Sequence, residues 1–180
     1  MSKSEAREEN NKLGEAQGLP DELGAVLARI SGAERVDQYG QAVIAIDAAA
    51  WAEVAVQLKE AGFESLVDMC GVDYQGYEAG SALGTRFEVV VNLISCSYGA
   101  RLRVRIGVDG EAPVCPSVCA VWPGANWFER EAFDMFGIEF TGHPELSRIL
   151  MPDDWSGHPL RKDFAVGAIP VQFSGAPRPQ

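Results

Sequence analysis

The sequence predicts an α+β fold built on a mixed or antiparallel sheet, with packed helices and an extended C-terminal segment. Some stretches have apolar residues at helical spacing, and others alternate between apolar and polar residues as strands do. Two of the alternating stretches are joined by a connection short enough for a hairpin. From residue 138 onward neither period persists. At 180 residues and 19.4 kDa, the chain is long enough for one domain with a core and too short for two of ordinary size.

The first expected element is an amphipathic helix at residues 19–31. Residues 1–18 before it are acidic and polar, and we expect them to form a disordered leader. Pro20 and Asp21 open the helix, and its apolar face follows the i, i+3, i+4, i+7 spacing: Leu23, Val26, Leu27 and Ile30.

A strand, a helix and another strand are expected next. Residues 41–47 alternate as a short strand, and Asp47 is a suitable N-cap for a helix over 48–61. Residues 63–74 predict the second strand. The helix carries an apolar stripe, and a glycine-rich loop follows the second strand: Trp51, Val54, Ala55, Leu58 and Ala61 in the stripe, and Gly76, Gly80 and Gly84 in the loop.

Residues 86–95 and 101–108 predict two paired strands. The first carries apolar residues on both faces, which is typical of a central strand. The connection between them is short enough for an antiparallel hairpin. The second strand alternates between an apolar face and a basic face: Leu102, Val104 and Ile106 against Arg101, Arg103 and Arg105.

Helical spacing returns after residue 113. We expect a short helix from Pro116 to Trp122, and then a longer one that ends at Gly137. Asn126 and Glu129 have the spacing of a capping box at the start of this longer helix.

The end of the chain lacks a period but contains much apolar material. We therefore expect an ordered segment that needs a surface to bury on. The chain divides into a leader at 1–18, an α+β domain at 19–137 and an extended partner-binding tail at 138–180.

The chain is acidic and poor in histidine. Lys and Arg number 15 against 26 Asp and Glu, which gives a net charge of −11. That balance argues against a protein that holds nucleic acid by neutralising phosphates. The chain has only two histidines, which argues against most metal sites and general-base catalytic sites, because histidine is the commonest residue in both. The polar start, and the lack of any run of ~18 apolar residues, predict a chain kept in the cytosol or on the cytosolic side of a membrane.

Two clusters of charge have both a structural and a functional interpretation. The stripe of Arg101, Arg103 and Arg105 is either a solvated face on an edge strand or a docking site for an acidic partner. The second cluster lies on the longer helix: Glu129, Arg130, Glu131 and Asp134.

The helix cluster allows three interactions. Arg130 and Asp134 are i, i+4 and able to pair, while Glu129 and Glu131 complement the helix dipole in the first turn. Glu131 and Asp134 have an i, i+3 spacing that metals use, but such sites draw on several helices and usually include histidine.

His143 and His158 each precede a proline. With Asp153, Asp154 and Asp163 they could form a hydrolytic or metal site, whereas the simpler interpretation is that each imidazole fixes a turn by hydrogen bonding. The neighbouring charges are able to pin the tail within the chain or across an interface: Arg161, Lys162 and Asp163.

The four cysteines form no CxxC pair and have no histidine nearby in the sequence. We expect free thiols rather than zinc or iron–sulfur ligands at Cys70, Cys96, Cys115 and Cys119. The sequence also lacks a phosphate-binding loop, a dinucleotide fingerprint, a nucleophile elbow and an HExxH motif.

Residues 122–164 resemble a known family. Asn126 to Ile138 reads NWFEREAFDMFGI, and Gly157 to Phe164 reads GHPLRKDF. Between them lie Gly142-His143-Pro144 and Arg148-Ile149-Leu150. This pattern is similar to the 30-kDa-type subunit of respiratory complex I, which is the C-type subunit of bacterial NADH-quinone oxidoreductase.

The chain departs from the family pattern in the tail. Ser147 stands where a basic residue commonly precedes Arg148, and residues 151–155 and 165–170 also differ from the commonest versions. These departures leave the electron donor of the parent complex open.

The resemblance implies an accessory subunit without chemistry of its own. It implies an α+β domain with an extended C-terminal segment, in the peripheral arm of a proton-translocating complex. The partners would be the 49-kDa-type subunit and the neighbouring small iron–sulfur subunit. FMN, iron–sulfur clusters, NADH and a quinone would be bound by other subunits, and this chain would bind no cofactor. It would lie at the cytoplasmic face of the cell membrane, associated only through the complex.

A set of residues is expected to contact the partner subunits. It combines the arginine stripe, the longer helix and the tail motifs: Arg101, Arg103, Arg105, Trp127, Glu129, Arg130, Glu131, Asp134, Phe136, His143, Arg148, Trp155, His158, Arg161, Lys162, Asp163 and Phe164. Two alternatives stay open. One is a stand-alone metal-dependent enzyme that uses His143, His158 and nearby acids. The other is the equivalent subunit of a ferredoxin- or deazaflavin-linked relative.

Overall fold

The computed structural model describes residues 34–38, 41–110 and 112–165, together with Gly24 and Ala28. The predicted leader at 1–18, nearly all of the predicted helix at 19–31 and the last part of the tail, from 166, lie outside the described residues.

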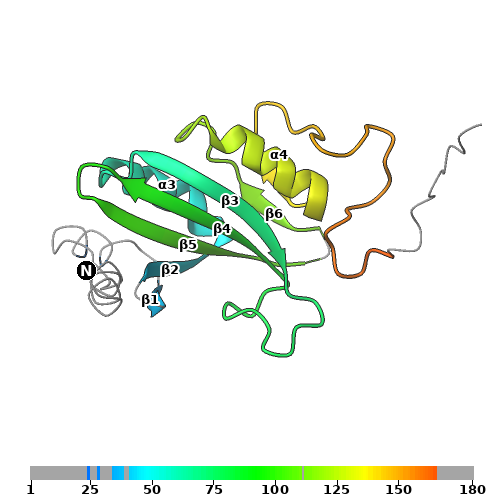
Figure 1. The fold of residues 1–180 in the computed structure, drawn as a ribbon, viewed down its shortest axis with the longest axis horizontal. Coiled ribbons are helices and arrows are strands. Elements are labelled where there is room, and N and C mark those ends of the chain that lie inside the picture. The colour runs from blue at the N-terminus through cyan, green and yellow to red at the C-terminus, as the bar shows by residue number, and fades with distance from the viewer. Residues whose placement is uncertain (1–23, 25–27, 29–33, 39–40, 111, 166–180) are drawn as a thin grey trace, which may run out of the picture.

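The described residues contain a five-stranded mixed sheet, so the predicted α+β fold is confirmed (Figure 1). Its strand order is β1-β2-β5-β4-β3, and β2 and β5 are parallel whereas the other neighbours are antiparallel. The bounds of the strands are Glu34–Gln38 for β1, Gln41–Asp47 for β2, Ser65–Asp73 for β3, Phe87–Ser95 for β4 and Ala100–Val108 for β5. No sequence pattern predicted β1.

Between residues 41 and 165, the described part of the chain has two α-helices beside the sheet. The first is α3 at Trp51–Glu60, preceded by a 3₁₀ turn, η1, at Ala48–Ala50, so the helix predicted over 48–61 is confirmed. Asp47 occupies the N-cap position of η1 but makes no side-chain capping bond. The second is α4 at Ala125–Phe136.

The short helix predicted from Pro116 to Trp122 is wrong. Val114–Pro116 forms the strand β6, which pairs in parallel with β7 at Glu139–Thr141. After β6 the chain makes turns, in which the amides of Val121 and Trp122 both donate to the carbonyl of Val118. The pairing of two segments that are distant along the chain overrides the local helical signal.

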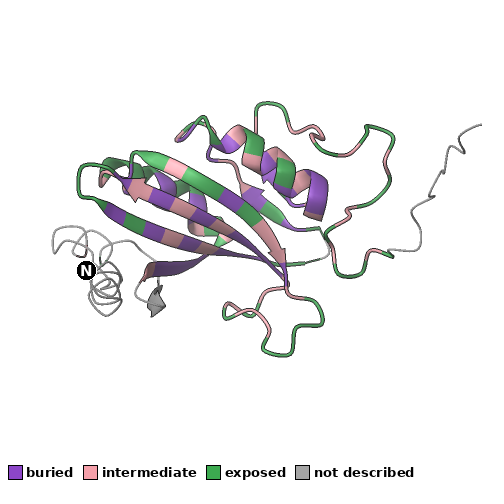
Figure 2. Cartoon of the chain, in the orientation of Figure 1, coloured by how far each residue is buried: buried purple, intermediate pink, exposed green. Residues whose placement is uncertain are grey.

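One face of the sheet forms the core. The apolar positions that alternate along β4 and β5 are buried and pack with the stripe of α3: Phe87, Val89, Val91, Leu93, Leu102, Val104, Ile106, Trp51, Val54, Ala55 and Leu58. Figure 2 shows buried and half-buried residues alternating along β4, with β3 more exposed. The alternation predicted from the sequence is confirmed.

The arginine stripe does not lie on an edge strand, because β5 sits between β2 and β4. Its third member, Arg105, donates twice to the buried carboxylate of Glu88, at 2.8 Å from both Nε and Nη2. Arg103 donates to the Asn92 side chain at 3.1 Å. Of the three arginines only Arg101 is exposed. A large part of the predicted basic face is therefore used across the strands of the sheet.

The helix α4 lies against β3 through a close contact (Figure 1). A Cβ atom added at Gly71 would lie 2.7 Å from the Phe136 ring. Glycine at this position therefore lets the helix approach the strand.

We predict that Gly71→Ala destabilises the domain, because the added methyl would push the Phe136 ring out of its contact. The expected loss is about 1–3 kcal/mol, as for other overpacked sites. Denaturant unfolding of the purified chain measures it. Combination with Phe136→Leu should recover part of the loss, and Cys70→Ala, at the exposed neighbour, should change it by less than about 0.5 kcal/mol. An unchanged stability in Gly71→Ala would contradict the tight contact.

Candidate partner-binding site

Residues 142–165 form a strap that runs around α4 and returns to the end of the sheet (Figure 1). The strap has no helix or strand. Near its end, two backbone amides hold it: the amide of Leu160 donates to the carbonyl of Met135 at 3.0 Å, and the amide of Lys162 donates to Asp73 at 2.9 Å. The described part of the tail is therefore held against the chain's own helix and sheet, with its side chains half-buried or exposed.

The carboxylate of Asp134 is the main attachment of the strap. It is fully buried, and its Oδ2 accepts three consecutive backbone amides, from Ile149 at 3.0 Å and from Leu150 and Met151 at 2.8 Å each. Its Oδ1 accepts a bond from Arg148 at 2.6 Å. The predicted pairing of Asp134 with Arg130 is wrong, because the strap brings Arg148 to this carboxylate.

The hydrogen bonds decide the charge state of Asp134. Desolvation pushes its pKa upward, but the three amide bonds and the Arg148 bond outweigh it and hold the pKa below its ordinary value. The carboxylate is thus kept ionised where it binds the strap.

Arg130 turns to the strap instead of to Asp134. Its Nε donates to the carbonyl of Ser147 at 3.1 Å, and its Nη2 donates to the Ser147 hydroxyl at 3.0 Å and the Arg148 carbonyl at 3.1 Å. The guanidinium also lies 5.3 Å from the ring of Trp127. Ser147, which departs from the family pattern, contributes its hydroxyl to this contact.

The C-terminal end of α4 is closed by the second tail motif. His158 Nδ1 donates to the carbonyl of Asp134 at 3.0 Å, and Arg161 Nε donates to that of Phe136 at 2.5 Å. These groups satisfy carbonyls that the helix end leaves without partners. Glycine is required at position 137 for two reasons. Its φ of 70° lies in the left-handed region, and a Cβ atom there would lie 2.5 Å from His158 Nε2.

A second buried carboxylate, Asp73, holds the end of the strap. It accepts two bonds from Arg86, at 3.2 and 3.1 Å, besides those from the amides of Gln75 and Lys162. Arg86 in turn donates to Asp163 at 2.9 Å. Desolvation raises the pKa of Asp73, but these bonds outweigh it and leave the pKa lowered. The cluster predicted at 161–163 therefore pins the tail within the chain.

Sequence reasoning missed Asp73 and Arg86 as partners of the tail. They lie 89 and 77 residues before the groups that they bind, and no local spacing connects them.

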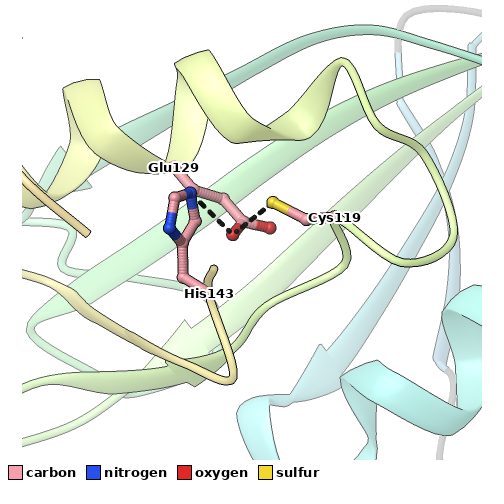
Figure 3. Close-up of side chains that lie close together, drawn as sticks. All are labelled: Cys119, Glu129 and His143. Atoms are coloured by element: carbon pink, nitrogen blue, oxygen red, sulfur yellow. Dashed lines mark hydrogen bonds and ion pairs between the residues drawn. The ribbon is translucent and has the colours of Figure 1, made fainter. Parts of the chain in front are cut away.

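Figure 3 shows a second cluster, in which Cys119, Glu129 and His143 point toward one another. Glu129 is fully buried and accepts the amide of Val118 at 2.7 Å and the Cys119 thiol at 3.3 Å. His143 Nε2 lies 4.0 Å from the Glu129 carboxylate. The predicted capping box is wrong, because α4 has Gly124 at its N-cap without a side-chain bond, and Glu129 faces inward.

The three side chains are donor types that zinc uses, and their donor atoms lie within 4.8 Å of one another. No spacing in the sequence predicts this cluster, because His143 and Cys119 are distant along the chain and only the fold brings them together. The hydrogen bonds, however, disagree with a metal at this position. His143 Nδ1 accepts the amide of Glu145 at 3.0 Å, and Nε2 faces the carbonyl of Asn126 at 3.3 Å, which can only accept. Nε2 therefore carries the proton and has no lone pair for a metal.

The two cysteines of this region are held as thiols. Burial raises the pKa of Cys119 to about 11, with the Glu129 charge as a further cause, and burial also raises the pKa of Cys115. In this form the Cys119 thiol donates its hydrogen bond to Glu129. The arrangement fits a hydrogen-bonded cluster that joins the loop after β6, α4 and the strap. The Glu145–His143 bond also confirms the turn that was predicted at this histidine.

The two histidines do not converge. His143 lies at Asn126 and His158 at Asp134, which places them ~12 Å apart along the helix axis at 1.5 Å per residue. Asp163 is bonded to Arg86. The described residues thus do not bring the two histidines together in one site.

Several of the expected partner-contact residues keep large exposed surfaces. Trp127 is 61% exposed. Leu150, which is not among the expected contact residues, is exposed to the same extent. Glu131 and Lys162 are also exposed. Trp155 and Phe164 are half-buried and stack on each other, with ring centroids 6.4 Å apart. Contact of any of these residues with another protein stays a prediction.

Residues 44–169 match the family described as the 30-kDa subunit of the respiratory-chain NADH dehydrogenase. The chain belongs to this family.

Relatives and solved structures agree with the family. The chain is 48% identical over 143 residues to the C subunit of the NADH-quinone oxidoreductase of Burkholderia mallei strain SAVP1, covering 77% of this chain and 72% of that protein. The same figures hold for the protein of Burkholderia pseudomallei strain K96243. The fold is similar to a trypsin-resistant fragment of Nqo5, with a TM-score of 0.63 and 36% identity, covering 69% of this chain and 99% of the fragment.

A more distant neighbour shares the fold alone. It is a chain of the membrane-bound sulfane sulfur reductase, described as an archaeal respiratory membrane complex, with a TM-score of 0.67 at 23% identity over 81% of this chain and 85% of that chain. In the described part of this 30-kDa family member, no helix has the length and apolar character needed to cross a membrane.

We predict that acid releases the strap through Asp134. Because the folded-state pKa lies below the unfolded one, the contribution of this carboxylate is complete above the ordinary pKa of 3.8 and is lost as the pH falls through the folded value. Hydrogen exchange of the amides of residues 149–151 measures it. Their protection should be high at pH 7 and collapse below about pH 4.

A matched pair of variants isolates this carboxylate. Asp134→Asn should weaken protection at neutral pH by the equivalent of about 1.5–3 kcal/mol, since bonds to a charged acceptor become neutral. Asp153→Asn, at an exposed strap carboxylate, should leave it unchanged. Wild-type protection of these amides in Asp134→Asn would contradict the attachment.

We predict that Glu129 stabilises the chain as a hydrogen-bond acceptor and not as a metal ligand. Glu129→Gln places an amide donor against the Cys119 thiol and His143 Nε2, and should lower the free energy of unfolding by about 1–3 kcal/mol. Glu131→Gln, on the exposed side of α4, is the control. Equimolar zinc should not raise the melting temperature. A zinc-dependent rise that His143→Gln abolishes would show a metal site instead.

Proposed function

We propose that this chain is a non-catalytic scaffold of the peripheral arm of a proton-translocating NADH-quinone oxidoreductase, where it supports the quinone-reducing module. The observation that carries the proposal is the family match over residues 44–169. The curated relatives, which are named as the C subunit of that enzyme, support it.

The use of the polar side chains supports an accessory role. Both histidines hold backbone groups, the buried carboxylates of Asp73 and Asp134 hold the strap, and Glu88 is paired with Arg105. Groups that are committed to the chain's own backbone lack the freedom that a general acid, base or nucleophile requires.

The proposal extends to partners, cofactors and location. The 49-kDa-type subunit and the small iron–sulfur subunit are the proposed neighbours. FMN, the iron–sulfur clusters, NADH and the quinone are held by other subunits, and this chain takes part in electron transfer only within the complex. Its place is the cytoplasmic face of the cell membrane, reached through the complex.

The test is co-purification from native membranes of a strain in which a tagged chain replaces the native copy. The full chain should bring down a multi-subunit assembly that oxidises NADH with a quinone, and the isolated chain should not turn over. Deletion of 147–180 should abolish recovery of the assembly. Asp134→Asn is the companion variant, because it loosens the strap without removing it. Full recovery with the deleted chain, or turnover by the chain alone, would contradict the proposal.

The same preparation decides two further points. The rates of quinone reduction by NADH, by reduced ferredoxin and by reduced deazaflavin are compared in the purified assembly. The donor that supports turnover is the electron donor of the complex. Charge reversal of Arg101 and Arg103 tests the docking stripe without disturbing the Arg105–Glu88 pair. Wild-type assembly at raised salt in this double variant would leave the stripe as a solvated face.

A further inference from the structure

The large apolar side chains that remain exposed in the described residues include Trp127, whose ring lies 5.3 Å from the Arg130 guanidinium, and Leu150, two residues after the Arg148 carbonyl that Arg130 binds. Trp127 on α4 and Leu150 on the strap are each 61% exposed, whereas Trp51 and Trp122 are buried in the core. A large exposed indole is costly to leave in water and typical of an interface anchor.

Both side chains stand on rigid supports. The Trp127 ring lies against the Arg130 guanidinium at 5.3 Å, and three bonds to Ser147 and Arg148 hold that guanidinium in place. The backbone of Leu150 is held by Asp134, as are the residues on either side of it. Because these groups are already ordered, binding through them loses little conformational entropy.

The charge of Arg130 lacks a counter-ion among the described residues. No carboxylate of the described residues lies within the 4.0 Å ion-pair distance of Arg130, since Asp134 pairs with Arg148 instead. All the bonds that Arg130 makes in this part of the chain go to neutral oxygens of Ser147 and Arg148. In a chain of net charge −11, an arginine without an acidic partner beside an exposed indole favours an occupant that supplies the carboxylate.

We propose that Trp127, Arg130 and Leu150 form a preorganised docking surface for an apolar pocket, bordered by a carboxylate, on another subunit of the assembly. The inference rests on the proposed function and narrows it. Most of the residues expected to contact partners are bound within the chain's own fold, whereas the side chains of Trp127 and Leu150 are exposed.

The experiment uses membranes from a strain that lacks the chain, to which purified full-length chain is added. Restored NADH–quinone turnover, titrated against added chain, measures its affinity for the rest of the assembly. Trp127→Ala and Leu150→Ala should each weaken the affinity by about thirtyfold, as for interface hot spots. Tyr77→Ala, at a tyrosine that is 63% exposed on the loop between β3 and β4, should bind as the wild type.

Two readouts separate docking from folding. The melting temperatures of the Trp127 and Leu150 variants should equal that of the wild type, because both side chains are exposed. Binding of the wild type should weaken as salt rises, and Arg130→Gln should flatten that dependence. Wild-type affinity in the Trp127 and Leu150 variants would overturn the surface and leave the proposed function standing. A wild-type chain that restores no turnover would overturn the proposed function itself.

Other occupants give different results. A Trp127-dependent dimer of the purified chain, seen in sedimentation equilibrium, would assign the surface to a second copy. Trp127-dependent flotation with vesicles of anionic phospholipid would assign it to the membrane. Either outcome overturns the proposal.

Discussion

The ionised, buried carboxylate of Asp134 is the interaction on which the outer half of the structure depends. It accepts hydrogen bonds from three successive backbone amides of the strap and from the Arg148 guanidinium. A buried charge is tolerated only when such bonds replace its hydration. The position of Leu150, the bonds of Arg130 to the strap and the contacts of His158 at the helix end all follow from this attachment.

The charged side chains of the sheet also bind groups within the chain. Glu88 and Arg105 pair across neighbouring strands, and Asp73 binds Arg86 and the strap together at the end of β3. An extended segment without helix or strand is thereby held by side chains. Charged groups used in this way stabilise one conformation of the chain, whereas the large apolar side chains of Trp127 and Leu150 remain exposed.

The sequence predicted the elements whose signal is local. The alternation along 86–95 and 101–108 and the stripe of 48–61 appear in the structure as β4, β5 and α3, because a strand or helix period depends only on neighbouring residues. The short helix at 116–122 was wrong, and β1 was missed. In both places pairing with another segment decides the backbone, and that pairing has no signature within one window of sequence.

By itself, the sequence determined the family, the α+β class and a set of candidate site residues. Only the tertiary structure decided what those residues do. Glu129 was expected in a helix capping box and is a buried acceptor. Arg130 and Asp134 were expected to be able to pair, and each binds the strap instead. His143 lies close to Cys119, which is distant in the sequence. The physical reason is that hydrogen-bond partners are chosen by distance in space, and the chain brings together groups that are up to 89 residues apart.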